Sequence, residues 1–255
     1  MTHAIVRLAA AVLLLGVATR TAAAVDPAPV PLTTARLYQL ALATGIGANA
    51  PEWERRRRMG ESFEDFALAV LQVPHNTRRY LSRLRADATR RLARQAAAVV
   101  TDGVRDLSEI GDGLISPPVQ IHPQASWYEV KAIRGNLRLS SGNHQIAGLI
   151  DALASVPFGM SMGARPTLTF VTTIDTRIGD EVTALATNLG VAVWQIMAYE
   201  VPGKGLCLGQ AQLLNPYVYL QVPALGRPGS TPRFSAPRPL QPAPPSTNPD
   251  PPVVE

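Results

Sequence analysis

The pattern of residues 126–154 constrains the fold most, because it changes from strand-like to helix-like within one short stretch. Aromatic and β-branched side chains predict a strand, a turn at residues 134–136 and a second short strand up to residue 139. From Ser140 onward apolar residues recur at helical spacing, with Ser140 or Ser141 as the expected N-cap. This succession of strand and helix predicts an α/β protein.

The flanking segments continue the alternation. Strands are predicted at residues 166–174 and 191–199, with a helix at residues 179–189 between them, and this order is typical of a parallel crossover. Before the central stretch, a short helix is predicted from residue 33 and a clearer one over residues 59–71.

Two charged side chains lie inside the central strand. Glu129 and Lys131 are two residues apart, so the alternation of a strand puts both on one face and Val130 on the other. Lys131 is one of only two lysines among the 24 basic residues. The pKa of an amine can be shifted by its surroundings, whereas a guanidinium stays charged, so this lysine is a candidate for handling water or protons.

A carboxylate is expected beside this pair at the end of a neighbouring strand. The apolar residues 96–104 predict a buried strand that ends in a turn at Asp102 and the following glycine. Asp112 is the alternative, because it also precedes a glycine and is nearer to Glu129 in the sequence. The residues before Asp112 are polar and do not favour a strand, so Asp102 is preferred and Asp112 is kept second.

These residues resemble the active-site motif of the PD-(D/E)xK nucleases, whose restriction-endonuclease-like fold is used by many bacterial nuclease toxins. Asp102 matches the first acid, although Thr101 replaces the proline that often precedes it. The sequence Glu129-Val130-Lys131 matches the second half of the motif. The resemblance implies a core of a mixed sheet flanked by helices.

The resemblance also implies a role for each residue. Asp102, Glu129 and the backbone carbonyl of Val130 would hold Mg²⁺ or Mn²⁺, hard cations that take oxygen ligands. Lys131 would orient or deprotonate the attacking water and offset charge on the phosphate. Gln145, at the start of the following helix, would point toward the same site.

The helix at residues 59–71 adds one more candidate. Its opening, from Gly60 to Glu64, resembles the Gly-x-x-Phe-Glu start of the first helix in the same toxins. Glu64 is therefore either an active-site carboxylate or a surface carboxylate.

Charge permits an anionic partner but does not require one. The formal net charge is +5, and arginines gather at residues 55–58 and again over residues 78–94. The first run is more typical of a solvated helix face than of a phosphate contact. The second run predicts a basic rim without a platform for stacking bases, because Tyr80 is the only aromatic residue within it. The four histidines and the single cysteine lack the spacing of a zinc site.

The ends of the chain differ from its centre. Residues 1–24 combine Arg7, an apolar run and a small-residue cleavage site before Val25, which predicts a signal peptide and a secreted or periplasmic protein. The remaining chain divides into a linker and short helix at 25–51, the catalytic domain at 52–221 and a disordered proline-rich tail at 222–255.

The resulting expectation is an exported bacterial toxin or effector that hydrolyses nucleic acid, DNA more readily than RNA. A cognate immunity protein is a possible partner, and no membrane span is expected after signal cleavage. The alternative is a non-catalytic exported binding protein on the same fold, in which Glu129 and Lys131 form a partly exposed ion pair of little consequence.

Overall fold

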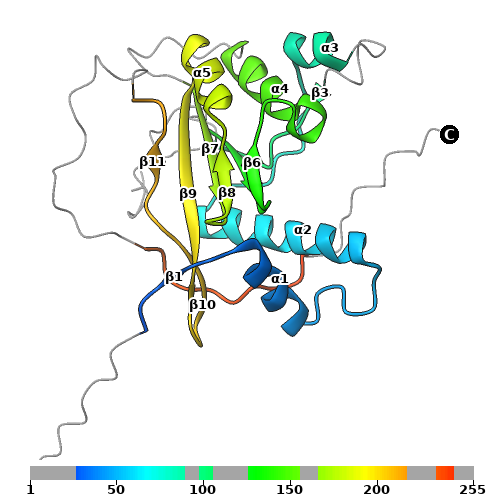
Figure 1. The fold of residues 1–255 in the computed structure, drawn as a ribbon, viewed down its shortest axis with the longest axis vertical. Coiled ribbons are helices and arrows are strands. Elements are labelled where there is room, and N and C mark those ends of the chain that lie inside the picture. Colours follow the sequence, from blue (N-terminus) through cyan, green and yellow to red (C-terminus); the bar gives the residue numbers. More distant parts are fainter. Residues whose placement is uncertain (1–26, 90–97, 106–125, 156–165, 217–233, 244–255) are drawn as a thin grey trace, which may run out of the picture.

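The computed structural model describes residues 27–89, 98–105, 126–155, 166–216 and 234–243. The predicted signal peptide and Asp112 lie outside these residues. In the described part of the chain, a seven-stranded mixed sheet carries helices on both faces (Figure 1). The predicted mixed α/β arrangement is confirmed. No helix in these residues is long and apolar enough to cross a membrane.

Three parallel strands form the centre of the sheet. β5 (Ser126–Lys131) pairs with β7 (Thr167–Thr172), which pairs with β9 (Ala192–Val201). The chain crosses from β7 to β9 through α5 (Asp180–Asn188), so the predicted parallel crossover is confirmed. β4 (Gly103–Arg105) pairs antiparallel with β5 along the other edge of that strand.

Three short strands complete β9 in antiparallel fashion: β1 (Val30–Pro31), β10 (Gly205–Leu208) and β11 (Gln212–Leu213). β1 corrects the expectation of a linker, because its residues pair with β9 and the next residue, Leu32, is fully buried. The apolar side chain of Leu32 therefore fixes a proline-rich stretch that has little strand propensity of its own.

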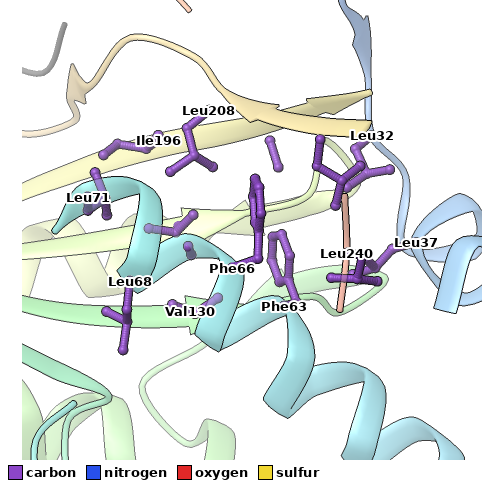
Figure 2. Packing of buried hydrophobic residues seen from close by; sticks show 14 of the residues in the cluster. Leu32, Leu37, Phe63, Phe66, Leu68, Leu71, Val130, Ile196, Leu208 and Leu240 are labelled. Atoms are coloured by element: carbon purple, nitrogen blue, oxygen red, sulfur yellow. The ribbon is translucent and has the colours of Figure 1, made fainter. Parts of the chain in front are cut away.

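The helices divide between the two faces of the sheet. α1 (Thr34–Ala43) and α2 (Glu52–Leu71) share one apolar core with Tyr128 and Val130 of β5. Figure 2 shows Val130 in this core. α4 (Ser141–Ser155) and α5 share the other core with Trp127 and Phe170. Alternate side chains of β5 thus enter opposite cores, as the period of a strand requires.

The arginines at residues 55–58, which could form either a solvated helix face or a phosphate contact, lie in the first half of α2. The predicted helix begins earlier than expected, at Glu52, and therefore includes the arginines. Three of these arginines pair with glutamates four residues away: Arg56 with Glu52, Arg57 with Glu61, and Arg58 with Glu54. Their side chains are exposed, so this run is a solvated helix face.

Two small ribbons lie outside the main sheet. β2 (Tyr80–Leu81) pairs with β3 (Ala98–Val99), and α3 (Arg83–Thr89) follows β2. β6 (Gly135–Leu137) pairs in parallel with β8 (Thr176–Ile178). The second short strand expected after residue 134 therefore exists as β6, and its partner follows β7.

A segment near the end of the chain packs on the core, which corrects the expectation of a disordered tail for residues 234–243. Leu240 is 5% exposed and belongs to the same apolar core as Leu37 and Phe63 (Figure 2). Arg238 exchanges two backbone hydrogen bonds of 2.6 Å with Leu206 of β10. One buried leucine and an available strand edge thus fix a proline-rich segment whose sequence has no apolar periodicity.

Candidate active site

The predicted pair on β5 forms a buried ion pair. Lys131 Nζ lies 2.7 Å from Glu129 Oε1, and the Glu129 side chain is fully buried. Val130, between them, faces the opposite core beneath α2. The period-2 argument from sequence is confirmed, and the alternation of β5 holds both charged groups on rigid backbone.

Asp102 reaches the same place from the neighbouring segment. Its Oδ2 accepts a hydrogen bond of 2.6 Å from the Val130 N–H and lies 3.5 Å from Lys131 Nζ. The preceding residue, Thr101, donates from Oγ1 to the Tyr128 carbonyl at 2.6 Å. The side chains of Thr101 and Asp102 therefore take over the pairing with β5 where the backbone pairing of β4 stops, at Gly103 and Tyr128.

Because side-chain hydrogen bonds replace backbone pairing here, the single strand predicted at residues 96–104 is divided into two short strands. β3 and β4 are separated at residues 100–102, where Thr101 and Asp102 bond to β5 through their side chains. Gly103 is needed at this point, because a Cβ there would lie 2.6 Å from Leu68 Cδ2 and 2.8 Å from Val73 Cγ1. The missing side chain lets α2 pack closely beside Asp102.

Asn76 holds the other side of the Asp102 turn, and the sequence analysis missed it. Its backbone N–H donates to the Asp102 carbonyl at 2.9 Å, and its Nδ2 donates to the Thr101 carbonyl at 3.0 Å. Its Oδ1 accepts from the Arg78 N–H, which is an Asx turn that asparagine favours. Turn propensity could have marked Asn76, but nothing local links it to residues 25 positions away.

Gln145 contacts Glu129 directly. Its Nε2 donates to Glu129 Oε1 at 3.1 Å and to the Val100 carbonyl at 3.0 Å. The three residues before Gln145 have left-handed backbone, with φ between 55° and 62°, so regular helix begins at Gln145 itself. Ser141 accepts a hydrogen bond from the earlier Arg138 N–H, so it does not act as the expected helix cap. The predicted meeting of Gln145 with the site is confirmed, although its local geometry was not foreseen.

Glu64 lies on α2, the helix that packs against β5. His75 lies between two carboxylates of that helix, with Nδ1 3.3 Å from Glu64 Oε1 and Nε2 2.8 Å from Asp65 Oδ1. Burial raises the pKa of Glu64 to about 8, with the charges of Asp102 and Glu129 adding to the rise and Lys131 opposing it. The charges of the cluster thus act on Glu64 from a distance, and its direct contact in the described residues is His75.

The electrostatics of the cluster come from crowding of like charges. The pKa of Glu129 is raised to about 7, mainly by burial and next by the charge of Asp102, while Lys131 acts in the opposite sense. Burial would lower the pKa of Lys131, but the attraction of Glu129 and Asp102 outweighs it and the pKa is raised. The lysine therefore stays charged, and the carboxylates compete for one nearby cation.

The donor set fits a hard divalent ion in one respect. Glu129 Oε2 is buried without a hydrogen-bond donor in the described residues, and Asp102 supplies a second carboxylate beside it. Oxygen donors of this kind suit Mg²⁺ or Mn²⁺. Among the same residues, no three His, Cys, Asp or Glu side chains gather closely enough to enclose a metal by themselves. Any ion held here would therefore keep other ligands, such as water or phosphate oxygens.

A hollow adjoins the outer side of His75. A cavity of about 560 Å³ lies between α2, His75 and the segment 234–243. Its lining includes Asp65, His75 and Arg238. The segment 234–243 thus forms one wall of this space, and His75, which also lines it, contacts Glu64.

Comparisons with known proteins found no matching family, no similar curated protein and no similar solved structure.

Proposed function

We propose that this protein is a metal-dependent nuclease with a restriction-endonuclease-like core, acting on DNA in preference to RNA. The observation that carries the proposal is the convergence of Glu129, Lys131 and Asp102 at one edge of β5. Gln145 joins them through Glu129. Two acids that can hold a metal ion and a lysine that can act on water are groups that suit phosphodiester hydrolysis.

Each residue has a distinct task in the proposed reaction. Asp102 and Glu129 would hold Mg²⁺ or Mn²⁺, with the Val130 carbonyl as a further donor. Such an ion, when bound, neutralises phosphate charge and makes water more acidic. Lys131, which is ion-paired with Glu129, would orient the attacking water and offset charge that develops on the phosphate. Gln145 fixes the rotamer of Glu129 through its amide.

The decisive experiment uses plasmid DNA and RNA with Mg²⁺ or Mn²⁺, each repeated with EDTA. Lys131→Ala should abolish cleavage while the protein stays folded and still binds the metal. Glu129→Ala should lose both activity and metal binding. Asp102→Asn should cost orders of magnitude in rate, whereas Asp112→Asn should cost almost nothing, because only a ligand charge matters to the metal.

Lys204→Ala is the matched control, because Lys204 is the only other lysine and lies exposed between β9 and β10. Circular dichroism of every variant checks the fold. Cleavage by Lys131→Ala at the wild-type rate contradicts the proposal. Pure, folded wild-type protein that cleaves neither nucleic acid also contradicts it, and favours the non-catalytic binding protein.

We also propose that the nuclease is exported as a bacterial toxin or effector, with a cognate immunity protein as partner. Export is supported by the basic, apolar and small-residue succession of residues 1–24, and the toxin role and its immunity partner follow only from the resemblance to nuclease toxins. The first residue of the secreted or periplasmic protein, determined by N-terminal sequencing, should be Val25 or a neighbour. A cytoplasmic pool that retains Met1 and nothing outside that compartment would show that the segment is not a cleaved signal.

A further inference from the structure

Three exposed arginines, here called the strip, lie in one short segment that Asn76 links to the candidate site. The strip consists of Arg78, Arg79 and Arg83, which lie before β2 and at the start of α3. Residues 74–85 contain no aspartate or glutamate. Among the described residues, no carboxylate lies within ion-pair distance of these three guanidinium groups. In the described part of the chain these three guanidinium groups are exposed and form no ion pair, and the nearest carboxylate in the sequence is Asp87, one helical turn after Arg83.

The arginines of α2 make the contrast clear. Arg56, Arg57 and Arg58 are also exposed, but each is paired with a glutamate one helical turn away. Their charge is balanced on the helix itself, so they attract a polyanion weakly. The strip and the helix run differ in charge compensation even though both are arginine-rich.

Asn76 ties the strip to the candidate site. Its side chain exchanges two hydrogen bonds of 3.0 Å with the backbone of Arg78, while it also holds the Thr101 carbonyl. Two residues of chain span no more than about 7 Å, so Arg78 begins close to the Asp102 turn. At the other end, the Asp151 carboxylate accepts hydrogen bonds from the N–H groups of Arg83 and Leu84 and fixes the start of α3.

The strip offers charge but no free aromatic ring on which a base could stack. The only aromatic residue between Arg78 and Arg83 is Tyr80. Its ring packs against Trp127, with ring centroids 4.2 Å apart, so it already has a stacking partner within the protein. Guanidinium groups without stacking partners suit phosphates, whose spacing does not depend on sequence.

We infer that the strip Arg78–Arg79–Arg83 binds the phosphate backbone of nucleic acid and holds it beside Asp102, Glu129 and Lys131. The inference rests on the proposed function, because bound nucleic acid is cleaved only if the adjoining site is a nuclease site. It makes a claim of its own, because binding through the strip should depend on salt and not on sequence.

The test measures binding in EDTA, where no cleavage occurs. Fluorescence anisotropy follows a labelled DNA duplex of mixed sequence between about 50 and 200 mM salt. The double variant Arg78→Ala/Arg79→Ala should bind about tenfold more weakly, and the slope of log affinity against log salt should fall by about 2. The double variant Arg56→Ala/Arg57→Ala, which removes the same charge from paired arginines, should bind like wild type.

Cleavage kinetics separate the inference from the proposed function. If the wild type cleaves, the strip variant should show a raised KM with kcat unchanged, because no reacting group is removed. Strip-dependent DNA binding without any cleavage supports the inference and contradicts the nuclease. Cleavage with KM unchanged in the strip variant supports the nuclease and overturns the inference.

Two further results would also overturn it. One is wild-type protein without salt-dependent affinity for DNA or RNA. The other is binding of an acidic polypeptide such as polyglutamate, lost in the strip variant, with no binding of nucleic acid. That second result would assign the strip to an acidic protein partner.

Discussion

At the scale of single residues, the cluster carries more negative charge than one lysine can balance. Glu64 and Glu129 both have a raised pKa, about 8 and about 7, and in both cases burial is the largest cause. Each glutamate therefore binds its proton more tightly in the folded protein than in the unfolded chain, where the ordinary value is 4.5. The metal-free protein is thus destabilised at high pH by these buried carboxylates.

The sign of this effect gives a prediction for Glu64→Gln. As pH rises from about 4.5 to about 8, the unfolded chain releases the Glu64 proton before the folded protein does, so the free energy of unfolding falls. An amide does not titrate, so the variant should gain stability relative to wild type as pH rises through this window. Urea denaturation in EDTA at about pH 5 and about pH 9 measures the difference.

The control for that prediction is Glu61→Gln, one turn earlier on α2 and exposed beside Arg57. Its stability difference from wild type should vary much less over the same range of pH. A pH-independent difference for Glu64→Gln would mean that the proton on Glu64 is not held by the fold.

At the scale of elements, the long helices and central strands could be predicted because their patterns are local. β7 and β9 are runs of β-branched and apolar residues, and α5 lies between glycines that limit it. Glu129 and Lys131 were placed on one face by the period of a strand alone. These features need no knowledge of distant partners.

The elements that the sequence did not reveal depend on partners far away in the chain. β8 has three residues and exists because it lies against β6, about forty positions earlier. The break at residues 100–102 exists because the side chains of Thr101 and Asp102 find hydrogen-bond partners on β5. The helical pattern predicts a serine cap before Gln145, but the structure has a left-handed turn there. In each case tertiary contacts outweighed local propensity.

At the scale of the whole molecule, the segment 234–243 should contribute to stability. A chain ending at Arg233 should be less stable than one ending at Ala243, because only the first loses Leu240 and the bridge to β10. The single substitution Leu240→Ala should cost about 2–5 kcal/mol in the free energy of unfolding. Chemical denaturation measures both effects.

Gln241→Ala is the control, because Gln241 is the exposed neighbour of Leu240. Equal stability of the two alanine variants would show that Leu240 does not belong to the core. Equal stability of the two truncated chains would show the same for the whole segment.

The strand pair β9–β10 receives both ends of the described chain. Val30 lies opposite Glu200, and Arg238 lies opposite Leu206, so the earliest and the latest described segments close the same region of sheet. Contacts of such long sequence separation slow folding, because a large loop must close before they form. A nascent chain on the ribosome cannot complete this region until residue 238 has emerged. We therefore expect the sheet to stay incomplete, and the chain to stay sensitive to proteolysis, until residue 238 is available to pair with β10.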